Sequence, residues 1–515
     1  MGDDNSKTKT IAITAAQGIQ NPHSAEHYGK DSSKGTPNLP LIRNLERYVR
    51  DNNAELRICA IPGSYVNEIE LHPFFHKRTD IFMERNAQGR LEKQREREEE
   101  KRNNWVVHGK SPNMPMHFFW KDIPDTNYET TGDRLNTNVR LIAVPEPSQN
   151  QNPLTGKGKY TKKYGGSSII MPSPKQVLTP VAKGQSGEYP KLMLTTGCCT
   201  NPSYNTTNRR GFDADEEHEF GFMVVDVLDD KLYLPRLVPA QANGTFIDQG
   251  IKYAKGVKSH KAKTVALVLG DSHVSELDLE TDKANDEMIL YFKPEHVHIH
   301  DAFSAQSINL HELDDEIAQA DKFERRVRSL EEELDETGEY LIKKAKLTGK
   351  GEVVVNYSNH DDMLYRWLAK GHYRNDPQNK SIAHSILGKY GSPKENALEV
   401  AIRHMFGEKI PKNVRFLKLG EDAEYWGYQC GVHGHKGKNG ARGSLKSLTE
   451  IYGKIIMGHV HQLEVGKGSM SVGTSSLIPL DYQLGQPSTS MAGNGVLYDG
   501  GLFQALPIIK GRWRK

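Results

Sequence analysis

The sequence has few cysteines and no long apolar run. Its four cysteines, Cys59, Cys198, Cys199 and Cys430, form neither a C-x-x-C pair nor a regularly spaced framework. This pattern is typical of free thiols in a reducing compartment. No stretch of about 18 apolar residues is present, and residues 1–7 do not begin a positive segment followed by an apolar one. We therefore expect no membrane span, no secretory signal and a cytoplasmic location.

The sequence also lacks an excess of charge of one sign. It has 515 residues, with 68 Lys and Arg against 66 Asp and Glu, and a formal net charge of +2. This balance excludes a uniformly basic, histone-like protein but is compatible with a local basic groove. The length predicts two or three domains, each able to bury a core. The one surplus of functional interest is the 21 histidines.

The pattern of apolar segments predicts an α/β protein with two parts. Segments 10–16 and 56–61 have the character of buried strands, and the periodicity of 41–48 between them is helical. That β-α-β order is typical of a layered α/β domain with a parallel sheet. A basic segment near residue 258, followed by a new apolar strand, marks the predicted boundary. We expect an N-terminal α/β accessory domain over 1–258 and a second α/β domain over 259–515. Further strands are predicted at 139–144, 192–196, 221–227, 232–237 and 264–269.

Polar residues follow five apolar segments of the C-terminal part. Asp271 and His273 follow segment 265–269, and Asp301 follows segment 296–300. Asn359, His360 and Asp361 follow segment 352–355. His433 and His435 follow segment 425–430, and His459 and His461 follow segment 455–457. Functional groups collect beyond the carboxyl ends of strands in open α/β sheets, so we expect these side chains to converge. A lone histidine there is more often an ordinary loop residue, but five such motifs in order are hard to explain by chance. Carboxylate, amide and imidazole donors without thiolates suit Mn²⁺ best, and also Mg²⁺, Fe or Zn²⁺.

The order of these motifs resembles that of the calcineurin-like metallophosphoesterase superfamily, which runs D-x-H, G-D, G-N-H-D/E, H and G-H-x-H. The resemblance covers about residues 264–480 and implies a four-layer αββα sandwich with two divalent metal ions. Two positions depart from the pattern, because His300 precedes Asp301 and Ser358 precedes Asn359 where the family has glycine.

The resemblance also implies a role for each residue. One metal would be held by Asp271, His273 and His461, the other by Asn359, His433 and His459, with Asp301 bridging them. His433 is favoured over His435 by its place after the strand and before Gly434, although both stay open. His360 would act as an acid or electrostatic stabiliser at the leaving-group oxygen. Asp361 would orient the ring of His360, or would cap the helix that follows, or would do both.

The absence of two family motifs argues against a phosphoprotein substrate. The sequence lacks the G-D-x-V-D-R-G and G-N-H-E patterns of phosphoprotein phosphatases. Nuclease members of the superfamily add a surface that seats DNA, and this chain has a large N-terminal part and several basic segments. We therefore expect a two-metal-dependent phosphodiesterase, a nuclease acting on DNA. The alternatives are a phosphomonoesterase or nucleotide hydrolase, and a non-enzymatic DNA-associated scaffold with a structural metal site.

Basic segments are the candidates for DNA contact. Residues 155–167 form a predicted Gly-rich loop, and the C-terminal tail pairs cations with Trp513. An ordinary solvated loop and tail explain both segments equally well, and the same holds for the charge-dense segment 84–104. The candidate nucleic-acid-binding residues are Lys157, Lys159, Lys162, Lys163, Arg512 and Arg514, and Arg442 and Lys446 after the fourth motif add to the basic surface.

A helical insertion is predicted near 305–346. Leu313, Ile317, Ala320, Phe323, Val327, Leu330 and Leu334 recur at spacings of three and four. A crossover helix packed on its own sheet explains this pattern. A self-association helix, and hence a homo-oligomer, is the sharper alternative.

The combination of an N-terminal α/β domain with this variant motif set also resembles the first-step DNA transfer proteins of T5-like bacteriophages. That resemblance implies a role in phage DNA transfer and host DNA degradation, with DNA as the partner and the host cytoplasm as the location.

Overall fold

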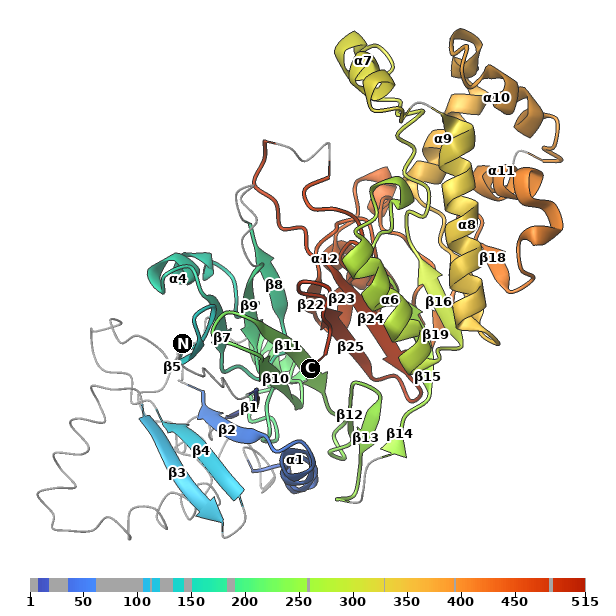
Figure 1. Cartoon of the computed structure of the whole chain (residues 1–515). Helices are drawn as coiled ribbons and strands as arrows, with labels where there is room; N and C mark the ends of the chain where they lie inside the picture. Colours follow the sequence, from blue (N-terminus) through green and yellow to red (C-terminus); the bar gives the residue numbers. More distant parts are fainter. Residues whose placement is uncertain are drawn as a thin grey trace, which may run out of the picture.

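The chain folds as a mixed α/β protein, as predicted. The structure is a computed structural model that describes residues 8–17, 36–61, 105–111, 114–120, 133–142, 151–182, 190–256, 260–327, 329–392, 395–480 and 485–514. Within these residues two six-stranded sheets and one eight-stranded sheet form the body of the protein, and helices lie on their faces (Figure 1). The charge-dense segment 84–104 lies outside the described residues.

The first six-stranded sheet has the order β11-β10-β1-β2-β4-β3. Strands β1, β2 and β4 are parallel, and β10 runs antiparallel to β1. Helix α1 (Leu39–Asp51) lies between β1 and β2 in the chain and buries Leu41, Leu45 and Tyr48 against the sheet, so the predicted β-α-β unit is confirmed. The bounds are β1 Lys9–Ala16, β2 Glu55–Ala60, β3 Trp105–Ser111, β4 Met114–Trp120, β10 Gly221–Val227 and β11 Tyr233–Pro239.

The second six-stranded sheet, ordered β18-β17-β16-β15-β24-β25, carries the candidate site. Strands β15 to β18 are parallel, so their carboxyl ends meet at one edge. Side chains of β15 alternate: Leu267 packs with helices α6 and α8 on one face, and Val268 packs with the other sheets on the opposite face. The bounds are β15 Thr264–Val268, β16 His296–Ile299, β17 Glu352–Val355, β18 Val414–Phe416, β24 Gly493–Tyr498, β25 Phe503–Pro507, α6 Leu279–Phe292 and α8 Leu330–Thr348.

The eight-stranded sheet joins the two parts of the chain. Its order is β21-β23-β22-β8-β9-β7-β6-β5, and β22 meets β8 at the pair Val465 and Leu178. One buried cluster contains Ile11 and Met223 together with Val268 and Leu497. The division at residue 258 stays a prediction, but strands from both sides of it share one sheet and one core. The bounds are β5 Asp133–Asn136, β6 Val139–Leu141, β7 Ser168–Met171, β8 Leu178–Val181, β9 Lys191–Thr195, β21 Ile456–Met457, β22 Glu464–Gly466 and β23 Ser469–Ser471.

The heptad-like pattern of 313–334 does not form one helix. Helix α7 spans Glu316–Glu324, Arg326 then adopts a φ of 59°, and α8 begins at Leu330. Leu330 and Leu334 are fully buried against the sheet, whereas Ile317 and Phe323 on α7 are exposed. A continuous self-association helix over these residues is therefore wrong, and α8 is a crossover helix between β16 and β17.

The segment 425–430 is also not one strand. It forms a hairpin of β19 (Glu424–Tyr425) and β20 (Tyr428–Gln429), with Trp426 and Gly427 at φ of 51° and 75° in the turn. The remaining elements are α4 Gly158–Lys163, α5 Arg209–Glu216, β12 Phe246–Asp248, β13 Ile251–Tyr253, β14 His260–Lys261, α9 Asn359–Ala369, α10 Lys380–Leu387, α11 Ala397–Phe406 and α12 Leu445–Tyr452, with short 3-10 turns at 274–276, 372–375, 407–409 and 438–440. Among the described residues, no helix combines the length and the apolar character needed to cross a membrane.

Candidate metal centre

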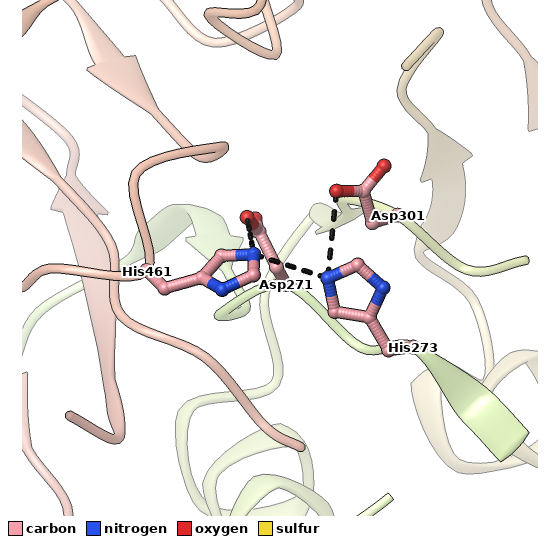
Figure 2. A group of neighbouring side chains, drawn as sticks. All are labelled: Asp271, His273, Asp301 and His461. Carbon is pink, nitrogen blue, oxygen red and sulfur yellow. Dashed lines mark hydrogen bonds and ion pairs between the residues drawn. The ribbon is translucent and has the colours of Figure 1, made fainter. Parts of the chain in front are cut away.

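The segments that follow β15, β16, β17, β20 and β21 meet at the carboxyl edge of the second sheet. Asp271 and His273 follow β15, Asp301 follows β16, and His461 follows β21 (Figure 2). Their ligand atoms all lie within 4.8 Å of one another, and the four side chains are buried. This group could hold a metal ion.

Direct contacts link this group. His461 Nε2 lies 3.0 Å from Asp271 Oδ2 and 3.0 Å from His273 Nε2, and His273 Nε2 lies 3.6 Å from Asp301 Oδ2 (Figure 2). Two imidazole nitrogens at contact distance, with carboxylates on both sides, are the arrangement of donors that a cation would draw together.

Asp301 also faces a second group of residues. Its Oδ2 lies 3.2 Å from His433 Nε2, and the same nitrogen lies 3.0 Å from Asn359 Oδ1. Burial disfavours the charged carboxylate, but the neighbouring His433 and His360 outweigh it and hold the pKa of Asp301 well below its ordinary value. Asp301 therefore stands as a carboxylate between the His273 side and the His433 side.

His459 contacts Asp271 through its backbone and lies beside His433 through its ring. Its N–H donates to Asp271 Oδ2 at 2.7 Å, and its ring lies 5.1 Å from that of His433 between centroids. Burial is the main cause that lowers the pKa of His459 to about 3. The ring is therefore neutral near pH 7, as a metal-ligating imidazole must be.

His300 is a member of the site that the motif pattern did not single out. It is fully buried, its Nδ1 lies 3.3 Å from His433 Nδ1, and its Nε2 has no hydrogen-bond partner. Asp271, His300 and His433 form a second group of side chains that could hold a metal ion. The only sequence signal was that a histidine stands where the family pattern has glycine before the aspartate.

Three buried atoms at the centre of the site have no hydrogen-bond partner in the described part of the protein. Asp271 Oδ1 and Asp301 Oδ1 make no hydrogen bond, like His300 Nε2. An unpartnered buried carboxylate oxygen is costly unless a cation or water meets it. The donor set therefore fits a divalent metal ion.

The backbone is also unusual where these ligands lie. His273, Asp301, His459 and His461 have φ of 42°, 45°, 74° and 54°. Such left-handed residues cost free energy and cluster at functional sites. Gly458 has no room for a side chain, because a Cβ there would overlap Asp271 Oδ1 and lie 2.9 Å from His300 Cγ.

His360 lies beside the cluster, and its ring is not held by Asp361. Its Nε2 is 4.0 Å from Asp301 Oδ2, and its Nδ1 is 2.6 Å from the backbone O of Ser304. Asp361 instead accepts from Ser358 N at 2.6 Å within the capping box of α9, and burial raises the pKa of Asp361 to about 7. The prediction that Asp361 orients the ring of His360 is therefore wrong, because the Ser304 carbonyl holds that ring. The alternative prediction, that Asp361 caps the helix that follows, is confirmed.

The structure also separates the two histidines of the fourth motif. His433 contacts Asp301 and Asn359, whereas the closest charged partner of His435 is Asp362, at 3.9 Å. Both ring nitrogens of His435 are buried without a hydrogen bond. Of the two histidines, His433 is therefore the one that lies beside the other predicted ligands.

The candidate DNA-binding residues lie in two segments of the chain. Lys159, Lys162 and Lys163 are exposed and Lys157 is half-buried, all at helix α4 rather than in an irregular loop, and Tyr160 stacks on Tyr164. At the C-terminus, Arg512 and Arg514 are exposed, but Trp513 is buried against Tyr291 and Phe292. The expectation that Trp513 takes part in a free basic tail is therefore wrong.

Comparison with known proteins gives one similarity. The chain is 27% identical to Protein A1 of Escherichia phage T5 over 318 residues, which cover 59% of this chain and 56% of that protein. The match thus spans little more than half the length of the relative. No protein-family model matches the chain, and no solved structure matches it. The chain is therefore similar to a protein of Escherichia phage T5, which agrees with the resemblance to phage proteins seen in the sequence.

Proposed function

We propose that the protein is a two-metal-dependent phosphodiesterase that cleaves DNA. The observation that carries this proposal is the position of Asp301, whose carboxylate faces His273 on one side and His433 on the other. A carboxylate shared by two groups of ligands is what a pair of divalent ions requires. The predicted αββα sandwich and the metallophosphoesterase resemblance belong to the same proposal.

The residues divide into two ligand groups. Asp271, His273 and His461 would hold one ion, Asn359, His433 and His459 the other, and Asp301 would bridge them. Mn²⁺ suits this mixture of donors best. When bound, such ions neutralise the phosphate and acidify an attacking water. His300, behind His433, would fix the orientation of that ring through the contact between their Nδ1 atoms.

His360 would stabilise the leaving group. The Ser304 carbonyl can only accept, so the proton on the Nδ1 side of His360 is fixed and Nε2 is left facing the site. From there a protonated Nε2 can donate to the oxygen that departs from phosphorus. His360 is given no ligand role, because it belongs to neither group of described side chains that could hold a metal ion, although its Nε2 lies 4.0 Å from Asp301 Oδ2.

The resemblance of the sequence to the first-step DNA transfer proteins of T5-like bacteriophages favours DNA as the substrate, within a role in phage DNA transfer and host DNA degradation. The similarity to a protein of phage T5 supports the phage context. The test is a substrate panel with purified protein and Mn²⁺: duplex DNA, single-stranded DNA, bis(p-nitrophenyl) phosphate and p-nitrophenyl phosphate. We expect cleavage of DNA and of the diester, with His360→Asn lowering kcat by about 10²–10⁴-fold.

His260→Asn is the matched control, because His260 is exposed on β14 and lies outside the site. It should cleave like the wild type. Hydrolysis of the monoester alone would replace the nuclease by a phosphomonoesterase. Full biological function of His360→Asn in infection would instead support a scaffold with a structural metal.

A further inference from the structure

The loop that follows His433 carries an excess of positive charge. Residues 436–446 contain Lys436, Lys438, Arg442 and Lys446 and no Asp or Glu. All four cationic side chains are exposed. Lys436 pairs with Asp362 at 2.6 Å, whereas the other three have no ion-pair partner within the described part of the chain. Lys438 and Arg442 lie in the loop, and Lys446 lies in the first turn of helix α12. Three unneutralised cations this close together in the chain attract a polyanion.

The base of this loop is fixed beside the candidate metal centre. A Cβ on Gly443 would overlap the backbone O of Gly434, so the loop folds back onto the residue that directly follows His433. Within the loop, Gly437 N donates to Ala441 O at 2.6 Å. Because His433 itself lies 3.2 Å from Asp301, the loop projects from the edge of the site and not from a distant surface.

Two neighbours define which side of the site the loop borders. Lys436 is tied to Asp362, and Asp362 accepts from Tyr357 Oη at 2.6 Å, so this end lies near the start of helix α9. At the other end, Gly443 packs against Gly434, where a Cβ would lie 3.2 Å from the backbone O of Gly458 and 3.5 Å from His459 Cβ. The loop thus borders the His433 and His459 side of the site.

We propose that segment 436–446, which comprises the loop and the first turn of α12, binds the backbone phosphates that flank the scissile phosphate of a nucleic acid. The inference rests on the proposed function and adds the surface that selects a polynucleotide over a small phosphate ester. A small ester ends at the metal centre and cannot reach Lys438 and Lys446 together, whereas a strand presents a phosphate at each nucleotide.

The test compares two charge-matched double variants, Lys438→Ala with Arg442→Ala and Lys409→Ala with Lys412→Ala. Lys409 and Lys412 are exposed and precede β18, so they lie at the amino edge of the parallel strands, opposite the site. The affinity of each protein for a labelled oligonucleotide is measured with Ca²⁺ at several salt concentrations, together with its melting temperature.

We expect the loop variant to bind about tenfold more weakly at low salt. Its plot of log affinity against log salt should flatten by about 0.7–0.9 for each phosphate that the variant no longer binds. With Mn²⁺, its cleavage of DNA should fall by a larger factor than its hydrolysis of bis(p-nitrophenyl) phosphate. The Lys409 and Lys412 variant should match the wild type in all three measurements.

Equal affinities and salt slopes for the two variants would overturn the inference, and so would a wild type that binds no oligonucleotide. A different result would contradict the proposed function, namely a wild type that hydrolyses neither DNA nor the small diester with Mn²⁺. The binding comparison decides the role of the loop in that case as well, because it needs no cleavage.

Discussion

Single residues decide whether the site can form, and the sequence revealed only some of them. Asp271, His273, Asp301 and His461 were predicted because each follows a short apolar segment, and the structure brings them together. The place of His300 could not be predicted, because it depends on a contact with His433 from a distant segment. The orientation of His360 was also hidden, since its partner is a backbone carbonyl, that of Ser304, which no side-chain pattern encodes.

Gly458 lies directly against Asp271 and His300, and a substitution there tests whether Asp271 is a metal ligand. We expect Gly458→Ala to displace Asp271 and His300, because the added Cβ has no free volume, and to cost about 1–3 kcal/mol of unfolding free energy. Mn²⁺ binding, followed by calorimetry, should weaken with it. Gly466→Ala on β22 is the control, since a Cβ there meets nothing within 4 Å. Normal Mn²⁺ affinity in Gly458→Ala would contradict the assignment of Asp271 as a ligand.

Elements were predicted well where an apolar run is bounded by turns and poorly where periodicity runs across a break. The heptad spacing of 313–334 hid the start of α8, although Ser329 precedes it and accepts from Glu332 N at 3.2 Å. A serine three residues before a glutamate is a helix-start signal, and here it outweighs the apolar repeat. The hairpin at Trp426 was missed because its turn requires two residues in left-handed conformation, and only Gly427 favours that conformation.

Helix α8 also carries a buried carboxyl group whose titration can be tested. Glu333 accepts from Gln306 N at 2.9 Å and from Ser307 N at 3.1 Å, and so ties α8 to the segment that follows Asp301. Burial raises the pKa of Glu333 from 4.5 to about 7. Because the folded value is the higher one, its contribution to stability is complete below about pH 4.5 and is lost as the pH rises through about 7.

Glu333→Gln does not titrate, so the wild type should lose about 3 kcal/mol of unfolding free energy relative to this variant between pH 4.5 and pH 8. Urea unfolding at several pH values measures the difference. Glu332→Gln changes an exposed neighbour on the same helix and should show no such trend. If the difference in unfolding free energy between the wild type and Glu333→Gln does not change with pH, Glu333 is solvated in solution.

At the scale of the whole molecule, the sequence predicted two successive parts but not the way in which they are joined. Strands β8 and β22 have only four and three residues. They meet at one residue pair, Leu178 and Val465, which lie far apart in the sequence. Pairings this short and this distant leave no pattern in local composition. The junction also uses polar contacts: Gln504 Nε2 donates to Asp248 Oδ1 at 2.9 Å, and Gln504 Oε1 accepts from Gln249 N at 2.9 Å.

This junction predicts that the C-terminal part depends on the N-terminal part for its stability. In a fragment of residues 259–515, Val268 and Leu497 lose the apolar partners Ile11 and Met223 and become exposed. We expect the fragment to melt roughly 10 °C or more below the full chain and to bind Mn²⁺ more weakly. The full chain should unfold in one calorimetric transition, because a shared core couples the two parts. Two separate transitions, or a fragment as stable as the full chain, would show instead that residue 258 divides two independent domains.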